Sequence, residues 1–528
     1  ELRDPSALAA LHRTAATAER AAGDAAAAVR HLLAAGDRQE AFELVFGPVW
    51  DLYRSGSTRD LAIWFDQFPD DFVGSDPDRI ITFATTLSLM GRLDDAASWN
   101  DRATALLGSQ ESDSSGLTFS RILVELGRGD TVAVRRQVEA LESAVDPGAS
   151  RWNPPAAIAT VLALCALVDD DIVGARRWVE AIADTPALPE RARAVGHPAR
   201  RAWLALEEGR FDEAAQLSDA SLAEIGDERR GAAHAITELF VVKVRLATER
   251  LDVDAADLWS ERAVDLAAEL STPLYRFLAH AAQLGAIELR SGSTTAASVA
   301  NDLARGEVSE ALLPRYQLLA AELAARAGHS DVASHHLADL PATPRRRLVE
   351  ARVGLGRGGF APARALLEDT QGLQLRLQIQ AELLRYLAAP DEIAHLDRAL
   401  GLGARRGFVW TYLREGSEIV DALRRLVVAD ARWGSTRLAD ALLGQRGTSP
   451  TSHALIEPLS PKETQVLQLF PTHLSTVEMA SQLFVSASTV RTHVKAIYRK
   501  LEVNSRSEAV VRAQVLGLIG RSGTPARA

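Results

Sequence analysis

A short turn motif that recurs between helix-forming segments constrains this chain most. Gly91–Ala96 reads Gly-Arg-Leu-Asp-Asp-Ala, and Gly209–Ala214 reads Gly-Arg-Phe-Asp-Glu-Ala. From Gly91 to Gly358 such turn signals return about every 38 residues on average, within the range of roughly 34–47 residues for stacked helical hairpins. A single hairpin buries too little apolar surface to fold alone, so we expect an array in which each hairpin packs on its neighbours.

Further turn signals are spread through the first 443 residues. They fall at Gly23, Gly36, Gly127, Asp169–Asp171, Leu251–Asp252, Gly292, Gly328 and Gly358–Gly359. The sequence between these turns is rich in Ala and Leu and lacks the apolar–polar alternation of a half-buried strand. The sequence therefore predicts an all-α fold, with a TPR-like superhelix of degenerate helical repeats over residues 1–443.

Looser segments divide the chain. Gly108–Gly116 reads as a loop, and Val145–Pro155, with three prolines, as a junction between two sub-arrays. Residues 444–457 are rich in Gly, Ser and Thr and predict a flexible linker. A second domain is expected at 458–520, followed by a disordered tail at 521–528.

The stretch from Val485 to Leu501 carries the most specific functional signal. Ser486 can accept a hydrogen bond from a free backbone N–H and so cap a helix. Apolar residues then recur at the helical period, at Val490, Val494, Ile497 and Leu501. Basic and hydroxyl side chains occupy another side, at Ser488, Arg491, Thr492, Lys495 and Arg499. A major groove admits such a helix, although a solvated charged face or a contact with a membrane or a partner protein would leave the same pattern.

Three more short helices are expected around this stretch, each opened by a capping box. The boxes pair Ser460 with Glu463, Ser475 with Glu478 and Ser505 with Glu508, and Pro461 stands at the first helical position of the first one. Together with the helix at Val485–Leu501 they make a domain of four short helices, with the second and third arranged as a helix-turn-helix.

Leu459–Ile519 resembles the DNA-binding domain of the LuxR/GerE family. The resemblance rests on L-S-P-K-E at Leu459–Glu463, V-S-A-S-T-V-R-T-H-V-K at Val485–Lys495, I-Y-R-K-L at Ile497–Leu501 and V-N-S-R-S-E-A-V at Val503–Val510. It implies a four-helix domain whose third helix enters the major groove of duplex DNA. Carried over, Arg491, Thr492 and Lys495 would face bases, and Ser486, Ser488, Thr489 and Arg499 would face phosphates.

The family often dimerises through its fourth helix, which implies a homodimer on DNA. Here that helix is apolar on two sides. One side carries Ala509, Val510, Ala513 and Leu516, the predicted dimer contact, and the other Val511, Val515 and Leu518. One side could pack on the domain and the other on a second copy. Two positions depart from the family: His473 replaces a usual Gly in a turn, and Val477 replaces a frequent basic residue.

The repeat region resembles that of the large ATP-dependent, MalT-like LuxR regulators. The passage Gly403–Gly416 is similar to the usual end of their repeats, and the opening residues to their beginning. In that class an ATPase module precedes the repeats. Because the chain starts at Glu1 inside a repeat, we expect the protein to continue upstream. No cofactor is expected in this chain, and ATP only with such an upstream module.

Charge is distributed unevenly between the two regions. The chain has a net charge of −11, whereas residues from Leu459 onward hold nine Lys and Arg against four Asp and Glu, a net of +5. The remainder therefore carries −16. A basic head on an acidic body is typical of a DNA-binding module attached to a body that does not bind DNA.

The remaining signals concern location. The only cysteine, Cys165, excludes an intrachain disulfide and favours a reducing compartment. The longest apolar run, Ala156–Val168, is shorter than the roughly 20 residues of a membrane span. We therefore expect a cytoplasmic, nucleoid-associated protein with no membrane partner.

Motifs for catalysis are weak or absent. Gly354–Gly359 matches G-x-G-x-x-G, but a helical segment precedes it, so we interpret it as a repeat turn. No P-loop, H-E-x-x-H or G-x-S-x-G motif occurs, and neither an enzyme nor a metal site is expected. Arg345–Arg347 follows Pro344 and reads as a solvated helix start, with a role in nucleic-acid binding as the weaker alternative. Most tryptophans, such as Trp50, Trp64, Trp178 and Trp203, are expected in core or hairpin packing, although some could line a ligand groove.

The sequence as a whole predicts a sequence-specific DNA-binding transcriptional regulator. Its repeat region would sense a small molecule or a protein partner and control the head. The alternative is a helical-repeat interaction scaffold whose head does not bind DNA.

Overall fold

The computed structural model describes most of the chain. The described residues are 5–46, 64–65, 67–108, 114–144, 154–183, 196–225, 233–368, 373–444, 461–470, 479–480, 486–501 and 509. Every secondary-structure element in these ranges is a helix. The all-α prediction is therefore confirmed for this part of the chain.

The chain divides into two compact units, Glu1–Gln445 and Arg446–Ala528. We call the first the repeat body and the second the head. The first helices of the repeat body are α1 (Pro5–Ala22), α2 (Ala25–Ala35), α3 (Arg38–Phe46), α6 (Asp70–Val73), α7 (Pro77–Leu89), α8 (Leu93–Leu107), α9 (Ser115–Arg128), α10 (Thr131–Ala144), α11 (Pro154–Val168) and α12 (Ile172–Ala183).

The repeat body continues with a second series of helices. They are α13 (His197–Glu207), α14 (Phe211–Ile225), α15 (Ala233–Glu249), α16 (Val253–Leu270), α17 (Pro273–Ser291), α18 (Ser293–Arg305), α19 (Leu313–Arg326), α20 (Ser330–Leu337), α21 (Pro344–Gly356), α22 (Phe360–Leu366), α23 (Leu375–Ala388), α24 (Ala394–Gly403), the 3₁₀ turn η4 (Ala404–Arg406), α25 (Trp410–Leu413), α26 (Ser417–Ala429) and α27 (Arg437–Leu443).

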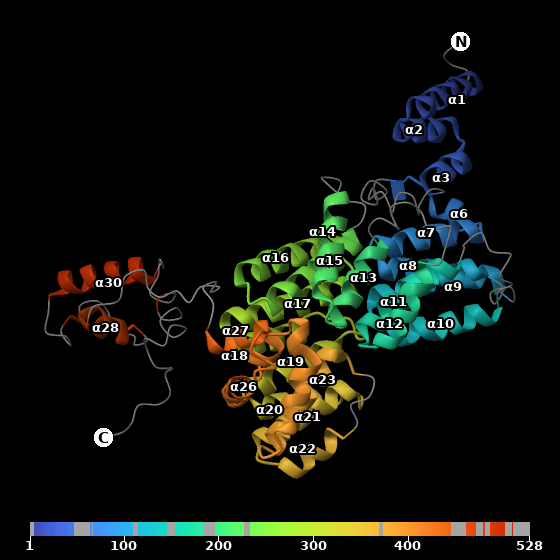
Figure 1. Cartoon of the computed structure of the whole chain (residues 1–528). Coiled ribbons are helices and arrows are strands. Elements are labelled where there is room, and N and C mark those ends of the chain that lie inside the picture. The colour runs from blue at the N-terminus through green and yellow to red at the C-terminus, as the bar shows by residue number, and fades with distance from the viewer. Residues whose placement is uncertain are drawn as a thin grey trace. The chain divides into compact units, whose positions relative to one another are not determined.

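Consecutive helices of the repeat body pair as hairpins, and the hairpins stack (Figure 1). In much of the array the first helix of one hairpin contacts the first helix of the next, as α13 does with α15, α15 with α17, and α21 with α23. One large core of buried aliphatic and aromatic side chains runs from α11 to α27. This is the predicted array of helical hairpins; its likeness to TPR repeats in particular stays a prediction.

Most hairpin turns lie where the sequence predicted them, with a left-handed residue in each. These residues are Gly23, Gly36, Gly91, Asp170, Gly209, Leu251, Gly292, Gly328 and Gly358. The Gly354–Gly359 segment joins α21 to α22, so its interpretation as a repeat turn is confirmed. The prediction at Gly127 is wrong, because this residue belongs to α9 and the turn residue is Gly129. Gly127 serves close packing instead, since a Cβ there would lie 2.7 Å from Leu93 Cδ2.

Turns early in the repeat body pack on segments far later in the chain. Ser309 donates a hydrogen bond of 2.9 Å from Oγ to the carbonyl of Arg128. At Gly129, with φ 85°, a Cβ would lie 2.4 Å from Leu312. Glu249 at the end of α15 accepts the backbone N–H of Val409 at 2.8 Å. These contacts bring the two halves of the array together.

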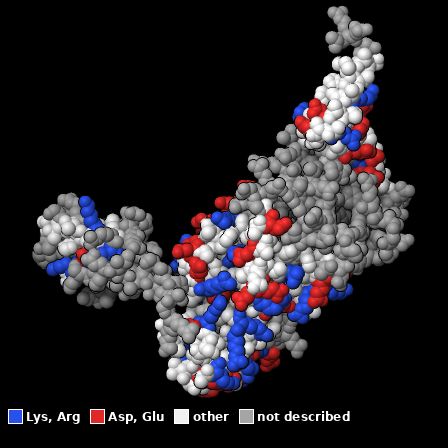
Figure 2. Space-filling view, turned by 45° about the horizontal axis from the view of Figure 1, so that its top comes forward, with Lys and Arg blue, Asp and Glu red and all other residues white. Residues whose placement is uncertain are grey.

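The surface of the repeat body is not uniformly acidic. Figure 2 shows Lys and Arg side chains gathered over the lower part of this unit in that view, with Asp and Glu more frequent above. The negative net charge predicted for the body is therefore an average over unlike regions. Among the described helices, none has both the length and the apolar character that crossing a membrane requires.

In the head, α28 (Pro461–Gln468) packs against α30 (Ala487–Leu501). Val490 and Ile497 of α30 are fully buried, as are Val466 and Leu467 of α28. Lys500 at the end of α30 forms an ion pair of 2.9 Å with the buried Glu463. The apolar stripe predicted for α30 is confirmed at Val490 and Ile497.

Candidate nucleic-acid interface and effector cavity

Helix α30 begins as its sequence predicted. Ser486 Oγ accepts the backbone N–H of Thr489 at 3.1 Å, which caps the helix. The two hydroxyl groups also lie 2.8 Å apart and share a hydrogen bond. Ser486 is exposed and Thr489 is partly buried. The start of the helix is thus fixed by side chains that the sequence assigned to the phosphate-facing group.

The opposite side of α30 from its buried residues is open to solvent. Thr492 and Lys495 are exposed, whereas Val490 and Ile497 are fully buried. Two candidate base-contacting side chains therefore project away from the packed face. Ser488, Arg491 and Arg499 belong to the same helix, but their side chains lie outside the description, so their assignment stays a prediction.

The predicted dimer contact is described at one position. Ala509 is fully buried, and its part in a dimer stays a prediction. Val510, Ala513 and Leu516 lie outside the described residues, and their part in a dimer stays a prediction.

The repeat body contains a partly open cavity of about 790 Å³. The first helices of successive hairpins line it, from α13 through α15, α17, α19 and α21 to α23. Apolar walls come from residues such as Phe277, Leu278 and Leu318, while several Arg, Asp and Glu side chains also face the space. Ligand pockets for small molecules have volumes of roughly 300–1,000 Å³, so this cavity has the size of an effector site.

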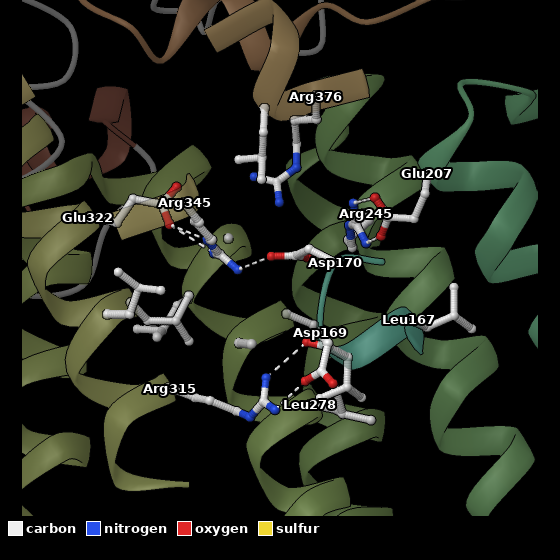
Figure 3. A pocket seen from close by; sticks show the side chains of 18 of the residues that line it. Leu167, Asp169, Asp170, Glu207, Arg245, Leu278, Arg315, Glu322, Arg345 and Arg376 are labelled. Carbon is white, nitrogen blue, oxygen red and sulfur yellow. Dashed lines mark hydrogen bonds and ion pairs between the residues drawn. The ribbon is translucent and has the colours of Figure 1, made fainter. Parts of the chain in front are cut away.

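One side of the cavity holds a chain of ion pairs (Figure 3). Arg345 contacts Glu322 at 2.8 Å and Asp170 at 3.2 Å. Arg326 lies between Glu322, at 2.9 Å, and Glu288, at 2.7 Å. These contacts join α17, α19 and α21 to the α11–α12 turn, which is remote in sequence.

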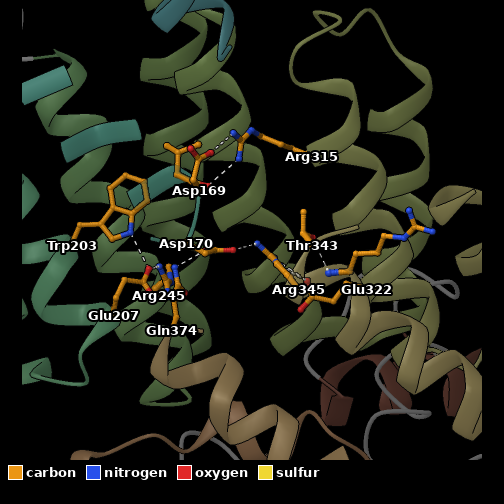
Figure 4. A network of polar contacts seen from close by, with 12 residues as sticks. Asp169, Asp170, Trp203, Glu207, Arg245, Arg315, Glu322, Thr343, Arg345 and Gln374 are labelled. Atoms are coloured by element: carbon orange, nitrogen blue, oxygen red, sulfur yellow. Dashed lines mark hydrogen bonds and ion pairs between the residues drawn. The ribbon is translucent and has the colours of Figure 1, made fainter. Parts of the chain in front are cut away.

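Further polar contacts surround the same turn (Figure 4). Arg315 donates to the carbonyl of Val168 at 3.0 Å and to Asp169. Gln374 donates to Asp170 at 2.5 Å. The segment Asp169–Asp171, which the sequence predicted only as a turn, is therefore held by Arg315 of α19, Arg345 of α21 and Gln374 just before α23.

The opposite wall carries one further buried pair. Arg245 forms an ion pair with Glu207, and Trp203 donates its indole N–H to the same carboxylate at 2.9 Å. Burial alone would raise the pKa of Glu207, but the Arg245 cation outweighs it and holds that pKa below its usual value. Trp203 lines the cavity. It is therefore a tryptophan that borders a ligand-sized space, as the sequence allowed for some of them.

The Arg345–Arg347 prediction is wrong for its first residue. Thr343 caps α21 by accepting the N–H of Arg346 at 3.1 Å, which is the expected helix start. Arg345, however, lies in the cavity wall between two carboxylates rather than in solvent. Other cavity residues gave no sequence signal, because Arg and Glu on a helix read as a solvated face until the fold shows which side is inside.

Acid should destabilise the repeat body in two steps. Burial, with a smaller contribution from Arg200, lowers the pKa of His234 to about 4. Burial also lowers the pKa of His197 and of His280. The three histidines bind protons more readily in the unfolded chain than in the folded one. The free energy of unfolding should therefore decrease as the pH falls from about 6.5 toward 4. Carboxylates with lowered pKa, such as Glu322, should extend the loss below about pH 4.5.

Urea unfolding midpoints measured from pH 8 to pH 4 test this expectation. The wild-type midpoint should fall below about pH 6.5, and a His234→Phe variant should show a shallower fall over the same interval. A flat wild-type profile between pH 6.5 and pH 4, or an unchanged slope in the variant, would contradict it.

Comparison with known proteins assigns the head. Residues 457–513 match the family described as bacterial regulatory proteins, luxR family. The chain therefore carries a luxR-family domain at its C-terminal end, as the sequence motifs predicted.

Comparison with individual proteins points to one type of regulator. The HTH-type transcriptional regulator MalT of Serratia proteamaculans is 27% identical over 199 residues, covering 31% of this chain and 22% of that protein. MalT of Yersinia pestis and MalT of Yersinia pseudotuberculosis are each 28% identical over 199 residues, with the same coverage of 31% and 22%. The match thus spans about a fifth of the length of these curated relatives. Together, the family and the relatives support the class of transcriptional regulator.

Proposed function

We propose that this chain is a LuxR-type transcriptional regulator that binds duplex DNA sequence-specifically. The observation that carries the proposal is the luxR-family match over residues 457–513, on a head whose α30 exposes Thr492 and Lys495 opposite a buried apolar stripe. A major groove admits a helix of this kind, and Lys and Thr side chains can contact base edges and phosphates there.

Seven side chains of the capped helix form the proposed DNA contact. The base-facing group is Arg491, Thr492 and Lys495, and the phosphate-facing group is Ser486, Ser488, Thr489 and Arg499. Binding as a homodimer on paired half-sites is part of the proposal, because head domains joined in pairs read two half-sites at a fixed spacing.

The repeat body is proposed to sense an effector and to control the head. Its cavity has the size of a small-molecule site and lies among contacts that join distant parts of the array. A ligand that binds more tightly to one arrangement of these contacts would shift the population toward it. No catalytic role is proposed for either unit.

Substituting Lys495 by Ala should weaken specific DNA binding by about 1–3 kcal/mol, roughly 5- to 150-fold, if Lys495 contacts a base edge. Fluorescence anisotropy with a selected duplex would measure the change. Lys462→Ala is the matched control, because Lys462 is exposed on α28 of the same head, outside the proposed contact. Unchanged affinity and sequence preference in the Lys495 variant would remove this residue from the interface.

The scaffold alternative makes a different prediction about salt. A DNA-binding head neutralises phosphates and releases counterions, so the logarithm of its affinity should fall linearly with the logarithm of salt concentration. A helical scaffold whose head does not bind DNA would give no such slope. Titrations of one duplex between 50 and 200 mM salt, the range in which this slope is commonly large, separate the two.

A further inference from the structure

Two arginines of the cavity lack the close partners that its other buried arginines have. Arg376 reaches from α23 into the space (Figure 3). Among the described residues it makes no hydrogen bond or ion pair, and its Nε is buried without a hydrogen-bond partner. Arg414, which follows α25, has Nε and Nη2 buried without hydrogen-bond partners. Its contacts with three carboxylates are long, at 3.7 Å to Glu415, 3.8 Å to Glu288 and 4.0 Å to Glu322.

The neighbouring arginines show what a satisfied site looks like in this cavity. Arg326 makes contacts of 2.7 and 2.9 Å with two carboxylates, and Arg345 makes contacts of 2.8 and 3.2 Å. Arg245 is paired with Glu207. Buried cations are normally paired, since an uncompensated charge away from water is costly. The two loosely held guanidinium groups therefore leave donors available in a space that has room for a ligand.

The electrostatics agree with this difference. Although burial opposes it, Glu288 and Glu322 raise the pKa of Arg326. For Arg376 the balance is reversed, because burial and the nearby Arg245 and Arg345 cations lower its pKa. Burial, followed by Arg326, lowers the pKa of Arg414 to about 9. An anion that accepts hydrogen bonds from these two guanidinium groups would satisfy donors that the protein leaves without partners.

We propose that the cavity binds an organic anion, with Arg376 and Arg414 donating hydrogen bonds to its carboxylate or phosphate group. The apolar wall of Phe277, Leu278 and Leu318 would take an apolar portion of the same molecule. Guanidinium groups suit both carboxylate and phosphate, to which they can donate two parallel hydrogen bonds. The inference names the effector class of the proposed sensor and rests on that role, but not on DNA binding.

The position of this anion gives it a route to the rest of the array. Arg345 and Gln374 hold Asp170 in the α11–α12 turn. Arg345 and Arg376 both line the cavity, and Gln374 lies two residues before Arg376 at the start of α23. A bound anion would therefore act beside the contact that joins the early hairpins to α21 and α23. The cavity is thus a place where a ligand can favour one arrangement of the array.

Thermal unfolding of the full chain without DNA tests the proposal. Phenyl phosphate, benzoate and the neutral benzyl alcohol serve as probes of similar size, each added at constant ionic strength. At least one of the two anions should raise the unfolding midpoint in a saturable way, and benzyl alcohol should raise it less. The larger of the two anion responses identifies phosphate or carboxylate as the preferred group. If neither anion exceeds the neutral probe, the proposal is overturned.

The Arg376→Gln variant separates a ligand contact from a structural role. It should lose the anion-dependent shift, while its midpoint without probe should equal or exceed that of the wild type, because a poorly compensated buried charge has been removed. Arg357→Gln is the matched control, since Arg357 is exposed and pairs with an exposed carboxylate; it should respond to anions as the wild type does. An undiminished anion shift in Arg376→Gln, or a lowered midpoint without probe, overturns the assignment. Because no DNA is present, these results do not depend on the function of the head.

Discussion

Replacing Glu322 by Ala is expected to lower the free energy of unfolding of the repeat body by about 3–5 kcal/mol. Glu322 is only 4% exposed and contacts Arg345 at 2.8 Å and Arg326 at 2.9 Å. Although burial opposes it, the surrounding arginines, led by Arg345, hold the pKa of Glu322 well below its usual value. The variant would leave both guanidinium groups buried with less compensation, which is why the loss is expected to be large.

Asp331→Ala is the matched control for this prediction. Asp331 also pairs with an arginine, Arg357 at 2.7 Å, but its side chain is 98% exposed. An exposed ion pair contributes about 0–1 kcal/mol, so this variant should unfold almost as the wild type does. Urea titrations followed by circular dichroism measure both. Equal, small effects at the two positions would show that the cavity pairs are no stronger than surface pairs.

Much of the repeat body could be predicted because its determinants are local. A glycine or a residue with positive φ ends one helix, and a short polar turn starts the next, so Gly209 and Gly292 mark turns without reference to the fold. Gly127 shows the limit of this reasoning. Gly127 lets α9 pack closely against Leu93 on another helix, where a Cβ would clash. Local sequence cannot distinguish a glycine used for close packing from a glycine used in a turn.

The cavity could not be predicted, since its polar groups are partnered across long stretches of chain. Arg345 looks like part of a basic helix start, yet its partners Glu322 and Asp170 lie on other elements. Arg376 stands out for the same reason, because the lack of a partner becomes visible only when the neighbouring helices are in place. Charged residues on a repeat helix give the same pattern whether they face solvent or an enclosed space.

The head could be predicted in part. The helix cap at Ser486 and the burial of Val490 and Ile497 follow from local pattern and helical period, and both were predicted. The pairing of Lys500 with Glu463 was not, because the sequence assigned Glu463 only to a capping box on its own helix. Lys500 of α30 therefore contacts α28 through Glu463. Lys495 of the same helix is exposed.

Replacing Ile497 by Asp is expected to abolish specific DNA binding. Ile497 is fully buried between α30 and the rest of the head, and a carboxylate there would cost several kcal/mol. A domain of this size has little stability to lose, since small domains are only marginally stable. The helix that carries the proposed contact should therefore unfold together with the head.

The same variant tests whether the two units fold separately. Because the contacts of the chain divide it into Glu1–Gln445 and Arg446–Ala528, the main thermal transition of the repeat body should stay at its wild-type temperature in Ile497→Asp, while anisotropy with the duplex falls to background. Lys495→Gln, two positions away on the exposed side of α30, should keep the head folded and weaken binding only in part. Retained DNA binding in Ile497→Asp would exclude α30 as the recognition helix, and a matching drop in the transition of the body would show that the two units unfold as one.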